Sequence, residues 1–332
     1  MLAVSLKERE IREVVGAPPV SDSGDDEIVA IATLAERQDR ALYFLNRPVS
    51  DAILQELAQL QGCVFLAKAG LDTYGLAQRN SVLENPNPRL AIARVLLFVE
   101  ENGRCRRSQR DREISCDARI SPLAAVEGCV HIAAGVRVEP FCLIGDGVAL
   151  GQGTIVRTGA RLIGDVTVGE GCVIGANAVI GGGGFGIDRD EQGRNVRVPQ
   201  LGGVRIGSQV EIGALSTVCS GTIGPTAIAD HVKIDDHVHV AHNARVGRNC
   251  VITAGVVIGG SATVGEDTWI GLQAIIRDGI SVGNGCLLGM GVMVSETLPD
   301  NAIVAGSPSR AVVAPRALGW TLLRVSNSRD DE

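Results

Sequence analysis

The sequence predicts a left-handed parallel β-helix, preceded by a small N-terminal α/β domain and followed by a short C-terminal helix. Aliphatic residues recur at every sixth position over long stretches of the chain. Glycine is abundant, with 42 among 332 residues, which indicates many tight turns. Aromatic residues make up only 3%, so the core must be built from Val, Ile, Leu and Ala.

The six-residue repeat decides the fold class. Every sixth residue is Ile, Val or Leu over 120–180, 206–218 and 228–294. A period of six fits neither an α-helix nor a long alternating strand. It fits short strands joined by turns, three to a coil, with the aliphatic side chains inside a triangular prism. We therefore expect the β-helix to occupy residues 120–306.

Two interruptions break the repeat, one at residues 181–203 and a four-residue slip around GTIGPTAIA. We expect 181–203 to leave the prism as an external loop, because a β-helix accommodates extra chain only at its corners. The loop begins GGGGFG, which does not match the dinucleotide fingerprint and has no helix signal behind it. A flap that presents Phe185 to a substrate is favoured over a simple connection.

The remaining segments are aperiodic. Residues 1–103 are expected to form the α/β domain, with a helix over 5–15, strands at IVAIATL, ALYFL and CVFLAKA, and helices at SDAILQELAQL and LAIARVLLFVEE. Residues 104–119 are charged and predict a linker. Residues 307–332 predict a tail whose AVVAPRALGWTLLRV segment forms one short helix.

Composition excludes several classes of protein. The net charge is −7 and the basic residues are scattered, so we expect no nucleic-acid partner. No apolar run approaches the ~20 residues of a membrane span. The charged N-terminus is unlike a signal peptide, which predicts a cytoplasmic protein. The nine cysteines form no CxxC pair, and we expect buried thiols at Cys142, Cys172, Cys250 and Cys286.

Four of the five histidines lie close together in sequence: His231, His237, His239 and His242. A zinc site is one interpretation, but the repeat places these side chains on different faces, so we expect no metal. The other interpretation singles out His242 at a corner, where an imidazole can take a proton from an amine or hydroxyl at neutral pH. A solvated surface histidine fits the spacing equally well. Asp235 and Asp236 both lie near enough in sequence to orient a ring.

Three stretches carry a family resemblance: VIGGGGFGIDRDEQGRNVRVPQLGGVRIGSQVEIGA, VKIDDHVHVAHNARVG and GGSATVGEDTWIG. They resemble the UDP-3-O-(3-hydroxyacyl)glucosamine N-acyltransferases of lipid A synthesis, a family of hexapeptide-repeat enzymes. ALYFLNRP and NPRLAIARVL are similar to that family's uridine-binding domain. The resemblance implies a homotrimer that transfers a 3-hydroxyacyl group from acyl carrier protein to the 2-amine of UDP-3-O-acylglucosamine, with no further cofactor.

The resemblance also implies roles for particular residues. His242, in AHN, would be the general base, and the backbone N–H of Gly260 would stabilise the oxyanion. The candidate substrate-binding residues are Phe44, Asn46, Phe185, Asp235, His239, Asn243 and Met290, with Met290 in the acyl channel.

Two departures keep an alternative open. Ser50 stands where the family has a second aromatic residue beside Phe44, and Arg277 and Asp278 stand where it has a second histidine. The alternative is an N-acyltransferase that acts on another nucleotide-linked amino sugar and takes its acyl group from acyl coenzyme A. A third hypothesis, from another class, is a non-catalytic or metal-binding β-helix trimer.

Overall fold

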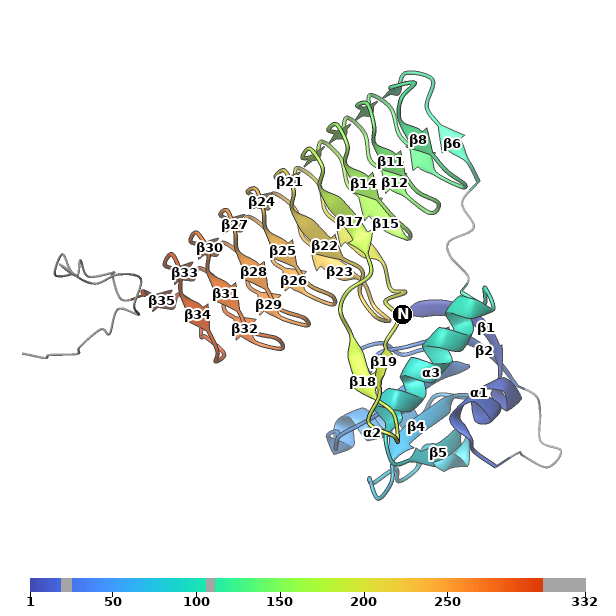
Figure 1. Ribbon diagram of the computed structural model, residues 1–332. Helices are drawn as coiled ribbons and strands as arrows, with labels where there is room; N and C mark the ends of the chain where they lie inside the picture. The colour runs from blue at the N-terminus through green and yellow to red at the C-terminus, as the bar shows by residue number, and fades with distance from the viewer. Residues whose placement is uncertain (19–25, 106–110, 307–332) are drawn as a thin grey trace, which may run out of the picture.

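The computed structural model describes residues 1–18, 26–105 and 111–306. It shows an α/β domain beside a long parallel β-helix (Figure 1). The N-terminal domain lies against the middle coils of the β-helix rather than at its end (Figure 1). The predicted C-terminal helix falls outside the described residues.

The N-terminal domain is a five-stranded sheet in the order β1-β2-β3-β4-β5, with only the β1–β2 pair antiparallel. Its elements are β1 (Leu2–Lys7), α1 (Glu8–Val15), β2 (Glu27–Ile31), β3 (Ala41–Leu45), α2 (Asp51–Ala58), β4 (Val64–Lys68), η1 (Leu76–Gln78), β5 (Ser81–Asn85) and α3 (Pro88–Glu101). Helix α3 begins where the Asn87 side chain accepts a hydrogen bond from the Leu90 N–H, and Pro88 occupies the first turn.

The prediction for residues 5–15 was wrong in part. The helix begins only at Glu8, because Leu2, Val4 and Leu6 alternate into the core as strand β1 and pair with β2. This alternation of period two is a strand signal that the weaker helical stripe obscured. Strand β5 was also missed, since only Leu83 among its residues is fully buried.

The β-helix has three faces, each a parallel sheet. Face 1 contains β7 (Arg119–Ile120), β10 (Arg137–Val138), β13 (Ile155–Val156), β16 (Val173–Ile174), β21 (Glu211–Ile212), β24 (Lys233–Ile234), β27 (Val251–Ile252), β30 (Trp269–Ile270), β33 (Leu287–Leu288) and β35 (Ile303–Val304). Face 2 contains β8 (Ala125–Val126), β11 (Leu143–Ile144), β14 (Arg161–Leu162), β17 (Val179–Gly182), β22 (Thr217–Cys219), β25 (His239–Val240), β28 (Val257–Ile258), β31 (Ile275–Ile276) and β34 (Met293–Val294). Face 3 contains β6 (Glu113–Ile114), β9 (His131–Ile132), β12 (Ala149–Leu150), β15 (Val166–Val168), β20 (Val204–Ile206), β23 (Thr226–Ile228), β26 (Arg245–Val246), β29 (Thr263–Val264) and β32 (Ser281–Val282).

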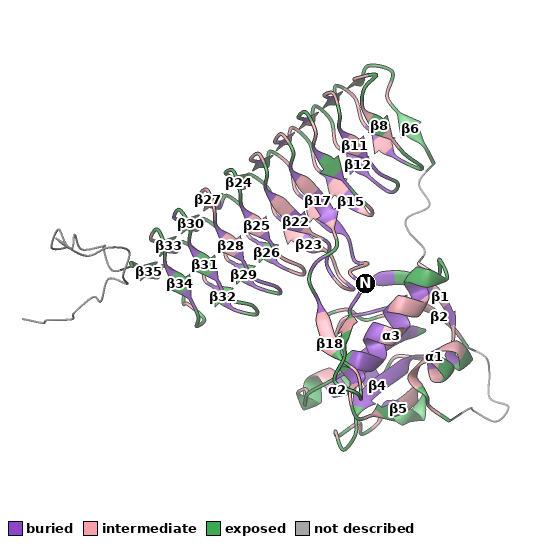
Figure 2. Ribbon diagram, viewed as in Figure 1, coloured by how far each residue is buried: buried purple, intermediate pink, exposed green. Residues whose placement is uncertain are grey.

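The chain visits the faces in the order 1, 2, 3, and we name each corner by the two faces that it joins. The second residue of nearly every short strand points inward, and these residues form one continuous aliphatic core (Figure 2). The predicted parallel β-helix is therefore confirmed. Each fully buried Val, Leu or Ile contributes roughly 1.5–3 kcal/mol relative to exposure.

The cysteines follow the same pattern. Cys142, Cys172, Cys250 and Cys286 are free and buried, as the sequence predicts. Burial raises the pKa of the Cys250 thiol to about 11, so the thiol stays protonated and packs as a small apolar group.

The first strand of the β-helix, β6, lies inside the segment 104–119 that the sequence predicts as a linker. Ile114 lies six residues before Ile120, so the repeat extends one strand further back than its buried part reveals. Among the described residues, no helix is long and apolar enough to cross a membrane.

Candidate active site

Both interruptions of the repeat leave the β-helix at corner 2–3. Of residues 181–203, the first two end β17 and residues 183–203 lie between β17 and β20, while residues 220–225 lie between β22 and β23. The longer insertion forms an antiparallel hairpin of β18 (Ile187–Arg189) and β19 (Asn195–Arg197), which lies along α3 (Figure 1). The sequence predicts this segment as an external loop, and in the structure this loop reaches helix α3 of the N-terminal domain.

The two insertions attach the N-terminal domain to the β-helix. Val198 and Ile223, one from each insertion, are buried in the apolar core of the N-terminal domain. Arg94 of α3 pairs with Glu191 of the hairpin at 2.7 Å, and Arg89 pairs with Asp188 at 3.4 Å. The interface therefore combines apolar burial with ion pairs at its edge.

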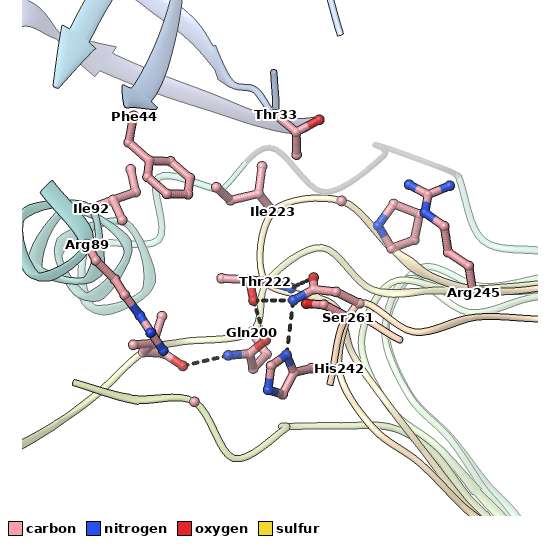
Figure 3. A pocket seen from close by; sticks show the side chains of 15 residues that line it. Thr33, Phe44, Arg89, Ile92, Gln200, Thr222, Ile223, His242, Arg245 and Ser261 are labelled. Atoms are coloured by element: carbon pink, nitrogen blue, oxygen red, sulfur yellow. Dashed lines mark hydrogen bonds between the residues drawn. The ribbon is translucent and has the colours of Figure 1, made fainter. Parts of the chain in front are cut away.

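A pocket of about 410 Å³ lies where the domain, the insertions and the β-helix meet (Figure 3). Phe44 and Ile92 reach it from the N-terminal domain, and His242 reaches it from the β-helix (Figure 3). The complete lining is Thr33, Phe44, Arg89, Ile92, Gly186, Val198, Gln200, Thr222, Ile223, Gly224, Pro225, His242, Asn243, Arg245 and Ser261. His242 is the only lining residue whose ordinary pKa lies near neutrality.

The strand register stacks four residues in one column at corner 2–3. Because Val218 pairs with Val240, Val240 with Ile258, and Ile258 with Ile276, the residues two positions later also lie one above another. They are Ser220, His242, Gly260 and Asp278. Residues 18 or 22 positions apart in sequence are thus stacked on neighbouring coils.

Two glycines make room for the His242 ring. A Cβ atom on Gly260 would lie 2.8 Å from both Cε1 and Nε2 of His242, and one on Gly184 would lie 2.8 Å from the His242 Cβ. Both distances are too short for non-bonded carbon or nitrogen atoms. The ring therefore occupies a slot between the next coil and the GGGGFG segment of the loop.

Hydrogen bonds and burial set the state of His242. The Nδ2 of Asn243 lies 3.0 Å from the Nδ1 of His242, and the Asn243 side chain also contacts Thr222. Burial lowers the pKa of His242, the carboxylate of Asp278 opposes this shift, and Arg89 and His239 add to it. The imidazole is therefore neutral at pH 7.

The backbone N–H of Gly260 donates to the Asp278 Oδ1 at 2.9 Å. The acceptor lies one coil away, and only the stacking of the β-helix brings it within reach. The missing side chain of Gly260 also leaves the slot for His242. The role of the Gly260 N–H in stabilising an oxyanion stays a prediction.

The other predicted residues divide into two groups. Phe44 and Asn243 line the pocket together with His242. The side chain of Phe185 is 82% exposed and outside the lining, although its neighbour Gly186 belongs to it. Asn46 is exposed just beyond β3.

Three predicted residues lie away from the pocket. His239 is on face 2, where its Nδ1 lies 2.7 Å from the Thr217 hydroxyl. Asp235 and Met290 are at corner 1–2, so within one chain they do not meet His242. His231 and His237 lie at corners 3–1 and 1–2, and no group of metal-ligating side chains occurs among the residues that the structure describes.

Sequence reasoning missed several residues of the pocket, among them Arg89, Gln200, Thr222 and Ile223. Arg89 opens a helix that the sequence predicts only from its apolar stripe. The other three lie in the two insertions, where no repeat assigns a direction to the side chains. The four-residue slip was the one signal that marked Thr222 and Ile223.

Comparison with known proteins agrees with this architecture. The family described as bacterial transferase hexapeptide (six repeats) matches residues 147–182 and 225–260, and the hexapeptide repeat of succinyl-transferase matches 261–296. A UDP-3-O-acylglucosamine N-acyltransferase of Paracidovorax citrulli (strain AAC00-1) is 30% identical over 70% of this chain and 66% of its own length. One of Coxiella burnetii (strain Dugway 5J108-111) is 33% identical over 68% of this chain and 66% of its own length.

Among solved structures, a UDP-N-acetylglucosamine acyltransferase from Campylobacter jejuni is 24% identical, covers 56% of this chain and 68% of that chain, and gives a TM-score of 0.46. The chain is thus similar to the hexapeptide-repeat transferases. Within them it is similar to the UDP-3-O-acylglucosamine N-acyltransferases, of which it spans 66% of the length, just under two thirds.

Proposed function

We propose that this protein is an N-acyltransferase that moves a 3-hydroxyacyl group from acyl carrier protein to the 2-amine of UDP-3-O-acylglucosamine, in the cytoplasm and in lipid A synthesis. The observation that carries the proposal is a single pocket lined by both Phe44 and His242. An aromatic face for a nucleobase and a neutral imidazole for acyl transfer are thereby brought together.

The lining suits a nucleotide sugar. Arg89 and Arg245 add two guanidinium groups to the same pocket, and guanidinium groups bind phosphate oxygens with bidentate geometry. The half-buried Phe44 offers one stacking surface. A nucleotide bound between these groups would hold its sugar near corner 2–3, where His242 lies.

One observation supports the alternative acceptor, a different nucleotide-linked amino sugar. No aromatic residue other than Phe44 lines the pocket, and Ser50 precedes α2 as an exposed residue. A different nucleotide-linked amino sugar, acylated from acyl coenzyme A, is therefore the second candidate.

We further propose a homotrimer. The last coils expose apolar side chains that a neighbouring chain would cover: Trp269 and Leu287 on face 1, Leu272 and Met290 at corner 1–2, and Ile275 and Met293 on face 2. Met290 is 72% exposed and lies at a different corner from His242. It can therefore line an acyl channel beside His242 only if another subunit supplies one of the two residues. Light scattering that gives the mass of three chains would support this arrangement.

The test of the reaction is turnover by the full chain with UDP-3-O-acylglucosamine and 3-hydroxyacyl carrier protein. Replacement His242→Ala is expected to lower kcat by about 10²–10⁴-fold. His131→Ala is the matched control, because His131 lies on face 3, several coils before His242, and its Nδ1 lies 3.0 Å from Glu113 Oε2. Turnover that survives in His242→Ala would contradict the role of His242. If turnover occurs only with acyl coenzyme A and another nucleotide-linked amino sugar, the second candidate function replaces the first.

A further inference from the structure

Asp188 of the external hairpin carries a carboxylate that the pocket lining does not include. It belongs to β18, which packs on α3, and its side chain is only 16% exposed. Its Oδ1 accepts a hydrogen bond from the backbone N–H of Arg189 at 2.7 Å. Its Oδ2 is shielded from solvent and receives no hydrogen bond from the described residues. Burying a carboxylate oxygen without a hydrogen bond costs free energy, so a positive charge beside it is expected.

Arg89 supplies that charge from the first turn of α3. Its Nε lies 3.4 Å from the Oδ2 of Asp188, a distance typical of an ion pair without a short hydrogen bond. Within the described ranges of the chain, the Nη1 and Nη2 groups of Arg89 have no partner. One edge of the guanidinium therefore faces the hairpin, and the opposite edge is free for a ligand.

The electrostatics of the pocket favour an anion at the free edge. The lining contains two arginines and neither Asp nor Glu. Arg89 is the second residue of α3, and the first turn of this helix holds no acidic residue. The free N–H groups of a helix N-terminus carry partial positive charge, so a cation there is unfavourable unless an anion lies nearby. Asp188 supplies one anion from the hairpin, and a ligand would supply another from the pocket.

The Arg89 side chain extends from α3 into the pocket (Figure 3). We propose that Asp188 is a positioning residue that holds the Arg89 guanidinium through Nε and directs its Nη groups at the diphosphate of the nucleotide-linked acceptor. This inference rests on the proposed function for the identity of the ligand. A guanidinium is a planar fork with five N–H donors, so fixing Nε also fixes the plane in which the Nη groups meet phosphate oxygens.

Positioning matters because the Arg89 side chain is long and 58% exposed. An unheld arginine has large rotamer freedom, and a ligand that must order it binds more weakly. The contact also joins two separate parts of the molecule, since Asp188 comes from the insertion at 181–203 and Arg89 from the N-terminal domain. The ion pair of Arg94 with Glu191 at 2.7 Å holds the same hairpin on the same helix.

The test compares two ligands that differ only in the diphosphate, UDP and uridine, by calorimetric titration of the full chain. Asp188→Asn keeps the shape of the side chain and removes its charge. We expect the affinity for UDP to fall about 10-fold, the equivalent of one hydrogen bond to a charged group, while the affinity for uridine stays the same. Unchanged or higher affinity for UDP would overturn the inference. An equal loss for both ligands would also overturn it, because the effect would not lie at the diphosphate.

A double-mutant cycle tests whether Asp188 acts through Arg89. Arg89→Gln alone should lower the affinity for UDP about 10- to 100-fold, since it removes the group that contacts phosphate. Adding Asp188→Asn to Arg89→Gln should cause no further loss, because a positioning residue has no effect without the group that it positions. Losses that simply add would mean that Asp188 acts independently of Arg89, and the inference would fail.

Asp190→Asn is the matched control. Asp190 lies on the same hairpin, but its carboxylate accepts from the Arg194 Nε at 2.7 Å and from backbone N–H groups of the turn. The affinity of this variant for UDP should equal that of the unaltered protein. A loss as large as that in Asp188→Asn would mean that any change in the hairpin weakens binding, which would overturn the specific role of Asp188.

Turnover separates this inference from the proposed function. Affinity for UDP that depends on Asp188, without turnover of UDP-3-O-acylglucosamine, contradicts the proposed reaction alone. Turnover in a protein whose affinity for UDP does not depend on Asp188 contradicts the inference alone. An unaltered protein with no affinity for UDP contradicts both.

Discussion

The regular coils of the β-helix and its corner 2–3 share one sequence repeat, but the regular coils form the apolar core whereas the corner forms the pocket. In the regular coils each residue has an equivalent one coil above and one below, and the inward side chains form a single apolar column. At corner 2–3 two insertions interrupt this equivalence within consecutive coils. Polar side chains from both insertions and from the coil meet there around one pocket.

The difference shows how a repetitive fold acquires a site. Identical coils cannot place different chemical groups around one point, because every coil would present the same surface. The insertions supply Gln200 and Thr222 from one side, while the column supplies His242 from the other. Repetition thus provides the rigid frame, and its interruption provides the specificity.

The largest expected effect lies in the regular coils. Ile258 is fully buried, so Ile258→Ala should lower the free energy of unfolding by about 2–5 kcal/mol through lost burial and a cavity. Chemical denaturation measures this loss. Turnover per folded molecule should change far less, since the side chain points away from the pocket. A large loss of turnover per folded molecule in Ile258→Ala would mean that the apolar core of the coils and the pocket do not act independently.

The next effect lies at the corner. Gly260→Ala puts a Cβ 2.8 Å from the His242 Nε2, so the ring must leave its slot, and kcat/KM should fall about 10²-fold. The fold should persist, because the ring can rotate away. Gly182→Ala serves as the control, since the nearest atom to its new Cβ is Val179 Cγ1 at 3.6 Å. Unchanged kcat/KM in Gly260→Ala would mean that turnover does not depend on the position of the His242 ring in this slot.

The smallest effect concerns pH. Burial lowers the pKa of His242, so the unfolded chain takes up its proton before the folded chain does. Stability should therefore fall as the pH drops below the unfolded pKa of about 6.5. The free energy of unfolding of the unaltered protein, measured between pH 7 and pH 5, should fall more than that of His242→Gln. The same pH dependence of the free energy of unfolding in both proteins would contradict the lowered pKa of His242.

Much of the frame could be predicted from the sequence, because its physical cause is local and periodic. Ile, Val and Leu at every sixth position require a short inward-facing strand at each step, whatever surrounds them. The same repeat located residues 181–203 as an external loop and His242 at a corner. In the N-terminal domain no long period averages out local ambiguity, so the sequence predicts helix for residues 5–7 of β1 and predicts no strand at β5.

Only the tertiary structure decided which groups meet. Sequence gives no reason for Asp278 to take the N–H of Gly260, because the two lie 18 residues apart and are joined only by the stacking of coils. It also separates Phe44 from His242 by most of the chain, yet both line one pocket. By itself the sequence determined the β-helix and the positions of its two insertions, because the six-residue spacing of the aliphatic side chains decides which of them can be buried together. The neighbours of His242 depend on hydrogen bonds and packing between distant segments that only the folded chain brings within reach.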